Sequence, residues 1–197
     1  VYKIKRDFPQ VVIVSSDYEA YAMYSKRMFT IVRRYTDIVE EYSIDECFAD
    51  LTGYDKIHGI TYEEILKRIQ DDIQRELNIS VSIGCGATKV IAKIGSKWNK
   101  PRGITVITSE KTAEFLSHVP IDDIWGIGPS SASLLLRKSI KTAYDFASLS
   151  KDRIFSFAHK PMKDLWNEFN CLQSYLFTTD SHDEDQKSLS RTLSFYP

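Results

Sequence analysis

Apolar and polar residues along the first 108 positions follow strand-like and helix-like patterns in turn. The unbroken β-branched run Val11–Val14 predicts a buried strand. The segment that follows, from about residue 17 to 34, predicts a helix for which Asp17 is a suitable N-cap. Between residues 61 and 77, isoleucines recur at every fourth position and polar residues fill the opposite face, so a second, amphipathic helix is expected. Thr61 and Glu64 form a capping-box pattern at its start.

Four further segments complete this alternation. Two short strand candidates, Ile38–Tyr42 and Cys47–Leu51, are separated by only four residues, so they predict a hairpin. Two more strands are expected at Ser80–Ala87 and Ile104–Ile107, with a helix over Thr88–Trp98 between them.

After Val119 the strand signal disappears. Residues 120–176 predict several short helices, broken at Gly126, Gly128 and Pro161, and the polar, acidic stretch 178–187 predicts a linker. The predicted fold class is therefore α+β: a β-sheet backed by helices, then a small all-helical region, with a boundary near residue 118.

Composition narrows the classes of function. The chain has 197 residues, 43% apolar and 27% charged, as in ordinary globular proteins. No apolar run approaches the roughly 18 residues of a membrane span. Three cysteines make neither a disulfide framework nor a C-x-x-C pair, which favours a reducing cytosol, and the four histidines lack the spacing of zinc ligands. A net charge of −1 argues against a generally basic nucleic-acid binder.

That net charge hides a segregation. All charged residues between positions 35 and 55 are acidic: Asp37, Glu40, Glu41, Asp45, Glu46, Asp50 and Asp55. All charged residues between positions 77 and 109 are basic: Lys89, Lys93, Lys97, Lys100 and Arg102. The two blocks are interpreted either as two solvated faces or as a metal site beside a polyanion site.

The hairpin tip carries the first candidate site. Asp45 and Glu46 are adjacent carboxylates in a turn that contains Ser43 and Ile44 but no Gly, Asn or Pro. Two neighbouring carboxylates repel each other unless a cation lies between them, which suits Mg²⁺. A solvated acidic turn is the alternative.

The lysines of the third predicted helix form the second candidate. Lys89, Lys93, Lys97 and Lys100 follow one face of it, and a triphosphate or a nucleic-acid backbone would relieve their mutual repulsion. A solvated lysine face is the alternative. Gly95 on this helix is small enough to permit close packing.

The third candidate is the turn Gly126-Ile127-Gly128, followed by Pro129. Between two short helices it predicts a helix–hairpin–helix motif, whose backbone N–H groups would bind DNA phosphates rather than bases. A simple corner between helices is the alternative.

Taken together, these segments resemble the Y-family, or translesion, DNA polymerases. Residues 41–53 (EYSIDECFADLTG) resemble the family's signature hairpin, residues 88–94 and 100–104 its next block, and residues 120–128 the start of its thumb. Trp125, the pair Asp122-Asp123 and Thr88 are more similar to the UmuC-like branch, the catalytic subunit of DNA polymerase V, than to the DinB-like branch.

The resemblance implies a domain organisation. Residues 1–118 would be part of the palm, without its first strand and the fingers; residues 119–177 would be the thumb; and residues 178–197 would be a linker and the start of a missing little-finger domain. We therefore expect a fragment that is itself inactive, from a cytoplasmic, nucleoid-associated bacterial enzyme of SOS mutagenesis.

The resemblance also implies site residues and partners. Asp45 and Glu46 would be the catalytic ligands of two Mg²⁺ ions, and Ser43, Lys100 and Arg102 would bind substrate. DNA would be bound by Lys89, Lys93, Gly126, Ile127 and Gly128. The implied partners are primer/template DNA and dNTP, with a UmuD-type subunit, a recombinase filament and a sliding clamp as further candidates. No membrane partner is expected.

Two rival interpretations remain open. One is another two-metal phosphotransferase, such as a nuclease, that uses Asp45 and Glu46. The other is a non-catalytic DNA-binding or protein-docking module that uses only the Gly-Ile-Gly turn.

Overall fold

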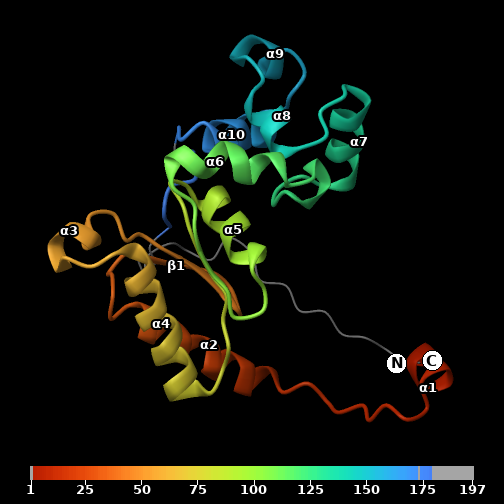
Figure 1. Ribbon diagram of the computed structural model, residues 1–197. Coiled ribbons are helices and arrows are strands. Elements are labelled where there is room, and N and C mark those ends of the chain that lie inside the picture. Colours follow the sequence, from red (N-terminus) through yellow and green to blue (C-terminus); the bar gives the residue numbers. More distant parts are fainter. Residues whose placement is uncertain (1, 173, 179–197) are drawn as a thin grey trace, which may run out of the picture.

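The computed structural model describes residues 2–172 and 174–178 (Figure 1). Its first part contains α1 (Tyr2–Asp7), α2 (Tyr18–Val32), β1 (Val39–Ser43), β2 (Glu46–Ala49), α3 (Tyr54–His58), α4 (Tyr62–Leu77), β3 (Ile83–Cys85), α5 (Lys89–Trp98) and β4 (Ile104–Val106). The remainder is helical: α6 (Ser109–Ser117), the 3₁₀ turn η1 (Ile121–Asp123), α7 (Pro129–Arg137), α8 (Ala143–Ala147), α9 (Lys151–Phe155) and α10 (Lys160–Phe169). The α+β class and the change to an all-helical region are as predicted.

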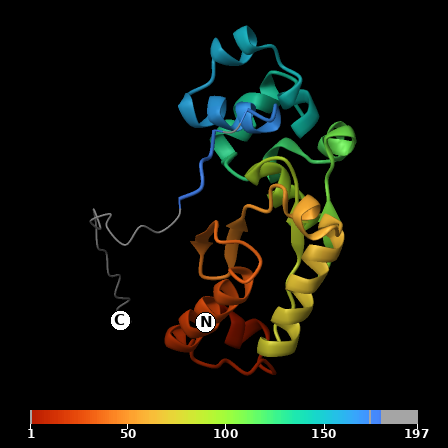
Figure 2. The same ribbon diagram turned by 90° about the vertical axis from the view of Figure 1, so that its left-hand side faces the viewer.

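Among the described residues the strands form two separate two-stranded sheets. Strands β1 and β2 make the predicted antiparallel hairpin. Strands β3 and β4 pair in parallel and are connected by α5. Figure 2 shows the two sheets between helices α2 and α4 on one side and the all-helical region on the other.

The helices begin where local capping residues predict. Asp17 accepts a hydrogen bond from the Ala20 N–H at 2.9 Å at the start of α2. Thr61 and Glu64 exchange both bonds of a capping box at the start of α4, which confirms that prediction. At the start of α5 the Thr88 side chain accepts a single hydrogen bond, from the Ile91 N–H at 3.5 Å.

Helix α5 packs on β3 through two glycines. A Cβ atom on Gly84 would lie 2.0 Å from the Ala92 carbonyl oxygen, so no other residue fits without moving the helix. Gly95 faces Gly84 from the helix, and its own Cβ would lie 3.1 Å from the Gly84 Cα. This confirms the close packing predicted for Gly95.

Two hydrophobic cores stabilise the molecule. One joins α2, the hairpin and α4 around Phe29, Ile31 and Ile73. The other joins the buried side of α5, through Val90 and Ile91, to the helices that follow. Helix α5 thus packs with the later helices, and the palm–thumb division near residue 118 stays a prediction.

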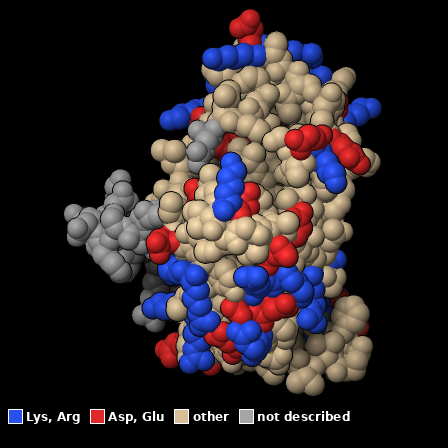
Figure 3. Space-filling view, turned by 60° about the vertical axis from the view of Figure 1, so that its left-hand side comes forward, with Lys and Arg blue, Asp and Glu red and all other residues tan. Residues whose placement is uncertain are grey.

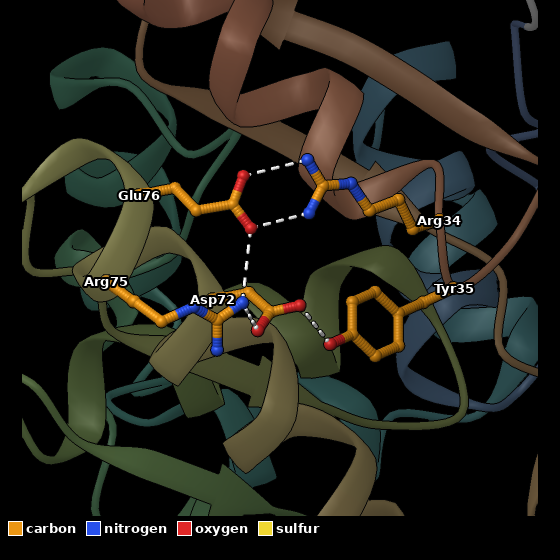
Figure 4. A network of polar contacts seen from close by, with 5 residues as sticks. All are labelled: Arg34, Tyr35, Asp72, Arg75 and Glu76. Carbon is orange, nitrogen blue, oxygen red and sulfur yellow. Dashed lines mark hydrogen bonds and ion pairs between the residues drawn. The ribbon is translucent and has the colours of Figure 1, made fainter.

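An ion-pair network joins the C-terminal end of α2 to α4 (Figure 4). Arg34 binds both oxygens of Glu76, at 2.6 and 2.8 Å, and the Tyr35 hydroxyl donates to Asp72 at 2.7 Å. Arg75 lies 2.5 Å from Asp72 within α4. This network holds the two helices that support the hairpin.

Two predictions are wrong. Val11–Val14 is not a buried strand: the segment precedes α2 without regular structure, and Val12 is 84% exposed, because none of the described residues pairs with it. Pro161 does not break a helix but lies in the first turn of α10, where the missing N–H has no intrahelical partner to lose. The structure also contains α1, α3 and α6, which were not predicted, while β3 is shorter than expected.

Of the predicted linker 178–187, all residues but Thr178 lie outside the described part of the chain. Within that part, no helix is both long and apolar enough to cross a membrane.

Candidate functional site

The hairpin tip presents the two predicted carboxylates. Ile44 and Asp45 form the turn, and Glu46 begins β2 opposite Ser43. The Ser43 hydroxyl donates a hydrogen bond to Asp45 Oδ1 at 2.9 Å, which orients that exposed carboxylate. The register shifts between Glu41 and Ser43, which alters the local twist of the strand next to the turn.

The acidic and basic blocks of the sequence meet in space. Lys93 Nζ lies 2.5 Å from Glu46 Oε1, and Lys89 Nζ lies 2.6 Å from Glu40 Oε2. Helix α5 thus presents two ammonium groups to the acidic hairpin. The sequence suggested either two solvated faces or a metal site beside a polyanion site. Neither interpretation included ion pairs between the two blocks, which partly neutralise the acidic hairpin and the basic helix α5 where they meet.

Lys89 is buried, with 6% of its side chain exposed, so the expected lysine face does not form at this position. Lys93 is also largely covered and lies 5.6 Å from the centroid of the Tyr42 ring. The DNA contacts expected of these two lysines stay predictions; in the structure both ammonium groups have carboxylate partners.

A groove of about 1100 Å³ runs between the hairpin, α2 and β3. Asp45, Glu46 and Lys100 all line it, although 54 positions separate Glu46 from Lys100 in the chain (100 − 46). Lys100 is exposed and lies in the turn two residues beyond the end of α5. The structure therefore brings together the carboxylates and one of the predicted substrate-binding cations.

Arg102 does not line this groove. It is exposed, has a φ of 61°, and its carbonyl accepts a hydrogen bond from the Gln70 side chain at 3.0 Å. Ser43 is likewise not among the lining residues and reaches the site only through Asp45.

The described residues contain part of a metal site at most. No group of three or more His, Cys, Asp or Glu side chains among them is placed to hold one ion. Asp45 and Glu46 supply carboxylate oxygens, which fit Mg²⁺ in kind, and Lys93 already shares the Glu46 carboxylate. Burial raises the pKa of the Cys47 and Cys85 thiols to about 11, which favours the protonated form at neutral pH.

The glycine turn has the geometry of the predicted helix–hairpin–helix corner. Gly126 adopts a φ of 93°, which strongly favours glycine, and Gly128 is the N-cap of α7 without a capping side chain. Ile127 is buried and its N–H donates to the Ile124 carbonyl. Neither the side chain nor the N–H of Ile127 is therefore free to contact DNA.

An aromatic cluster between hairpin and turn was not predicted. Trp125 Nε1 donates to the Tyr42 hydroxyl at 3.0 Å, and the Trp125 ring contacts the rings of Phe48 and Tyr175. Tyr42 is 45% exposed even though it belongs to this cluster. Tyr42 and Trp125 are 83 positions apart, and no pattern in the sequence indicates that they are in contact.

Charge on the molecular surface agrees with the mixed composition. Figure 3 shows acidic and basic side chains interspersed over one face rather than gathered into a single basic surface. This face therefore offers no general positive field to a polyanion.

Comparisons with known proteins agree with this geometry. Residues 1–97 match the model of the impB/mucB/samB family, and residues 109–139 match the family's helix–hairpin–helix motif. Both matches follow the chain order of the hairpin and the glycine turn. The chain belongs to this family, the Y-family of translesion DNA polymerases.

Its relatives include the DNA polymerase IV of Marinomonas sp., 38% identical over 152 residues, which are 75% of this chain and 43% of that protein. The DNA polymerase IV of Bacillus velezensis is 37% identical over 75% of this chain and 35% of its own length. A DinB family error-prone DNA polymerase from Sulfolobus solfataricus has a TM-score of 0.75 and 26% identity, covering 90% of this chain and 54% of that one. The chain thus spans about two-fifths or less of these curated relatives and about half of that solved structure.

These relatives do not support the UmuC-like assignment and favour the DinB-like branch, which had been ranked second. The residues behind that assignment have structural roles here. Thr88 caps α5, a role that Asn performs equally well, and Trp125 fills the aromatic cluster. Neither role identifies a branch.

Proposed function

We propose that the protein is part of an error-prone translesion DNA polymerase, which adds dNTPs to a primer 3′ end opposite damaged template. The observation that carries this proposal is the groove that gathers Asp45, Glu46 and Lys100. An insertion ternary complex of the Dbh DNA polymerase is 26% identical to this chain with a TM-score of 0.76, which supports primer/template DNA and dNTP as ligands.

In this proposal Asp45 and Glu46 would hold Mg²⁺ together with ligands beyond the described residues. Bound Mg²⁺ supplies charge neutralisation and activation of the attacking and leaving oxygens. Ser43 orients Asp45 through its hydrogen bond, and the Lys100 ammonium attracts the triphosphate of the incoming nucleotide. Arg102 stays a more distant candidate for the same ligand.

The backbone at Gly126 and Gly128 would hold a DNA phosphate at the start of α7. The N-cap of α7 makes no side-chain hydrogen bond, so this helix end offers N–H groups and a positive dipole end to an anion. The contact would position DNA without reading its sequence. A UmuD-type subunit, a recombinase filament and a sliding clamp stay proposed partners of the whole protein.

The test is a chimera in which the matched segment of this chain replaces the corresponding segment of the Bacillus velezensis relative, over an alignment of 147 residues. With Mg²⁺ it should extend a primer, and Asp45→Asn should lower the extension rate by about 10³-fold, because a neutral amide binds the cation poorly. DNA affinity, measured by fluorescence anisotropy, should change less than twofold. Lys111→Met, on the exposed surface of α6, is the matched control.

The outcomes separate the rivals. Unchanged extension in Asp45→Asn with intact DNA binding would favour the non-catalytic module. Mg²⁺-dependent cleavage of DNA without extension would favour the nuclease. No group of three or more carboxylates among the described residues is placed to hold one ion, and the expected result for the unfused chain is no primer extension.

A further inference from the structure

Residues 174–178 follow α10 as a short segment without helix or strand, which reaches the hairpin at Glu40. Its first residues are held by α10: the buried Glu168 carboxylate accepts hydrogen bonds from the N–H groups of Ser174, at 2.6 Å, and Tyr175, at 2.8 Å. Its last residues are held from the other side, by the hairpin and α5.

The second attachment is made by an ion pair. Lys89 Nζ donates to the Leu176 carbonyl at 2.7 Å, and Glu40 Oε2 accepts from the Thr178 N–H at 2.7 Å. The same two groups lie 2.6 Å from each other. Donors and acceptors thus alternate from Thr178 through Glu40 and Lys89 to Leu176.

This alternation matches what a neighbouring β-strand offers. In an extended chain the carbonyl of one residue and the N–H two residues later point to the same side, where a partner strand supplies a donor and an acceptor. Here the two charged side chains supply both. Apart from the Phe177 ring, 4.6 Å from Lys89 Nζ, the contacts that Glu40 and Lys89 make with residues 176–178 are to the backbone.

We propose that the Glu40–Lys89 pair is a docking site for the extended backbone of residues 176–178, and that Lys89 is a positioning residue rather than a DNA contact. The pair fixes the exit of the all-helical region on the hairpin that bears Asp45 and Glu46. Phe177 lines the groove with those carboxylates, so docking also sets one wall of the groove. The importance of this groove wall rests on the proposed function, whereas the docking of the segment does not.

The burial of the pair agrees with a backbone-binding role. Only 6% of the Lys89 side chain and 15% of the Glu40 side chain are exposed. Two buried charges are stable only where further hydrogen bonds complete their shells, and the Leu176 carbonyl and Thr178 N–H do so. Thr88, the residue before Lys89, donates to the Glu168 carbonyl at 3.1 Å, so both anchors of the segment meet at the start of α5.

The test is amide hydrogen exchange by NMR on the 197-residue chain with two double variants. In Glu40→Gln/Lys89→Met the charges are removed at similar volume, a change that buried pairs often tolerate. In Glu40→Lys/Lys89→Glu the ion pair is restored, but an ammonium then faces the Thr178 N–H and a carboxylate faces the Leu176 carbonyl. Lys111→Met is the control.

We expect the Thr178 amide to exchange at least tenfold faster in both double variants, while Ser174 and Tyr175, held by Glu168, change less than twofold. The charge swap discriminates most sharply: a pair that only stabilises the fold would be rescued by it, whereas a docking site for the backbone would not. Thr178 exchange within twofold of the unchanged chain in the swap would overturn the proposal.

Loss of the fold in both double variants would overturn it as well, because the pair would then be a requirement of the whole core. An unprotected Thr178 amide in the unchanged chain would have the same consequence. Exchange is measured without DNA or nucleotide, so failure of the docking proposal and failure of the proposed polymerase function are distinguishable.

Discussion

The hairpin β1–β2 and the turn at Gly126–Gly128 are both candidate elements for handling phosphates, and they are built in opposite ways. In the hairpin the candidate groups are the side chains of Asp45 and Glu46, and lysines of α5, distant in sequence, pair with its acidic residues. The chemistry of the turn lies in its backbone, which Gly126 shapes through a φ of 93°.

This difference has a consequence for mutation. A site made of side chains depends on partners that fold against it, so a substitution far away in the sequence can change it. A site made of backbone depends on local conformation, so substitutions within the turn itself should have the largest effects. Trp125, which precedes the turn and donates to Tyr42 of the hairpin, is where the two sites contact each other.

Of the substitutions that test this difference between hairpin and turn, one at Gly126 is expected to change the free energy of unfolding most. Gly126→Ala should lower the free energy of unfolding by roughly 1–2 kcal/mol, because a Cβ at positive φ is strained. Urea unfolding measures the loss. Gly128→Ala is the matched control: its φ is −82° and no atom lies within 4 Å of the added Cβ, so its loss should stay below about 0.5 kcal/mol. Equal losses in the two variants would contradict a conformational cause.

A smaller effect is expected where the hairpin and the turn meet. Trp125→Phe removes the donor to the Tyr42 hydroxyl and should cost about 1 kcal/mol. Tyr42→Phe should cost a similar amount, and the double variant should cost little more than either, because both remove one hydrogen bond. A double-mutant cycle by urea unfolding checks this. Strictly additive losses would show that the two side chains are not coupled.

The smallest effect on stability is expected in the network that joins the end of α2 to α4. Burial, with the hydrogen bond to Asp72, raises the pKa of Tyr35 to about 12. The unfolded chain ionises Tyr35 from its ordinary pKa of 10.0, so this contribution to stability is present below pH 10 and is lost as the pH rises toward 12. Tyr35→Phe should therefore show a smaller fall in urea midpoint between these pH values. Cys47 and Cys85 titrate in the same window in both proteins and cancel in the comparison.

Features that depend on neighbouring residues could be predicted from the sequence. The capping groups Asp17, Thr61 with Glu64, and Thr88 lie within three residues of the N–H groups they bind, so the starts of α2, α4 and α5 follow from local pattern. The hairpin and the corner at Gly126 are likewise local. Family membership also followed, because the motifs that carry the resemblance are short and ordered.

Features that depend on distant partners could not be predicted. Val11–Val14 has the composition of a buried strand, but a strand needs a neighbour to bond its backbone, and composition does not show whether one is present. The branch within the family was misjudged because Thr88 caps a helix and Trp125 packs in an aromatic cluster, and other sequences can fill both roles.

By itself the sequence determined the helix starts, the hairpin, the glycine corner and the separation of acidic from basic residues, because these are set by spacing along the chain. Only the tertiary structure decided what the separated charges do. Lys89 and Lys93 meet Glu40 and Glu46 because α5 packs on β3 through Gly84 and Gly95, which brings the basic block against the hairpin. Coulomb attraction depends on distance in space, and only the fold sets that distance.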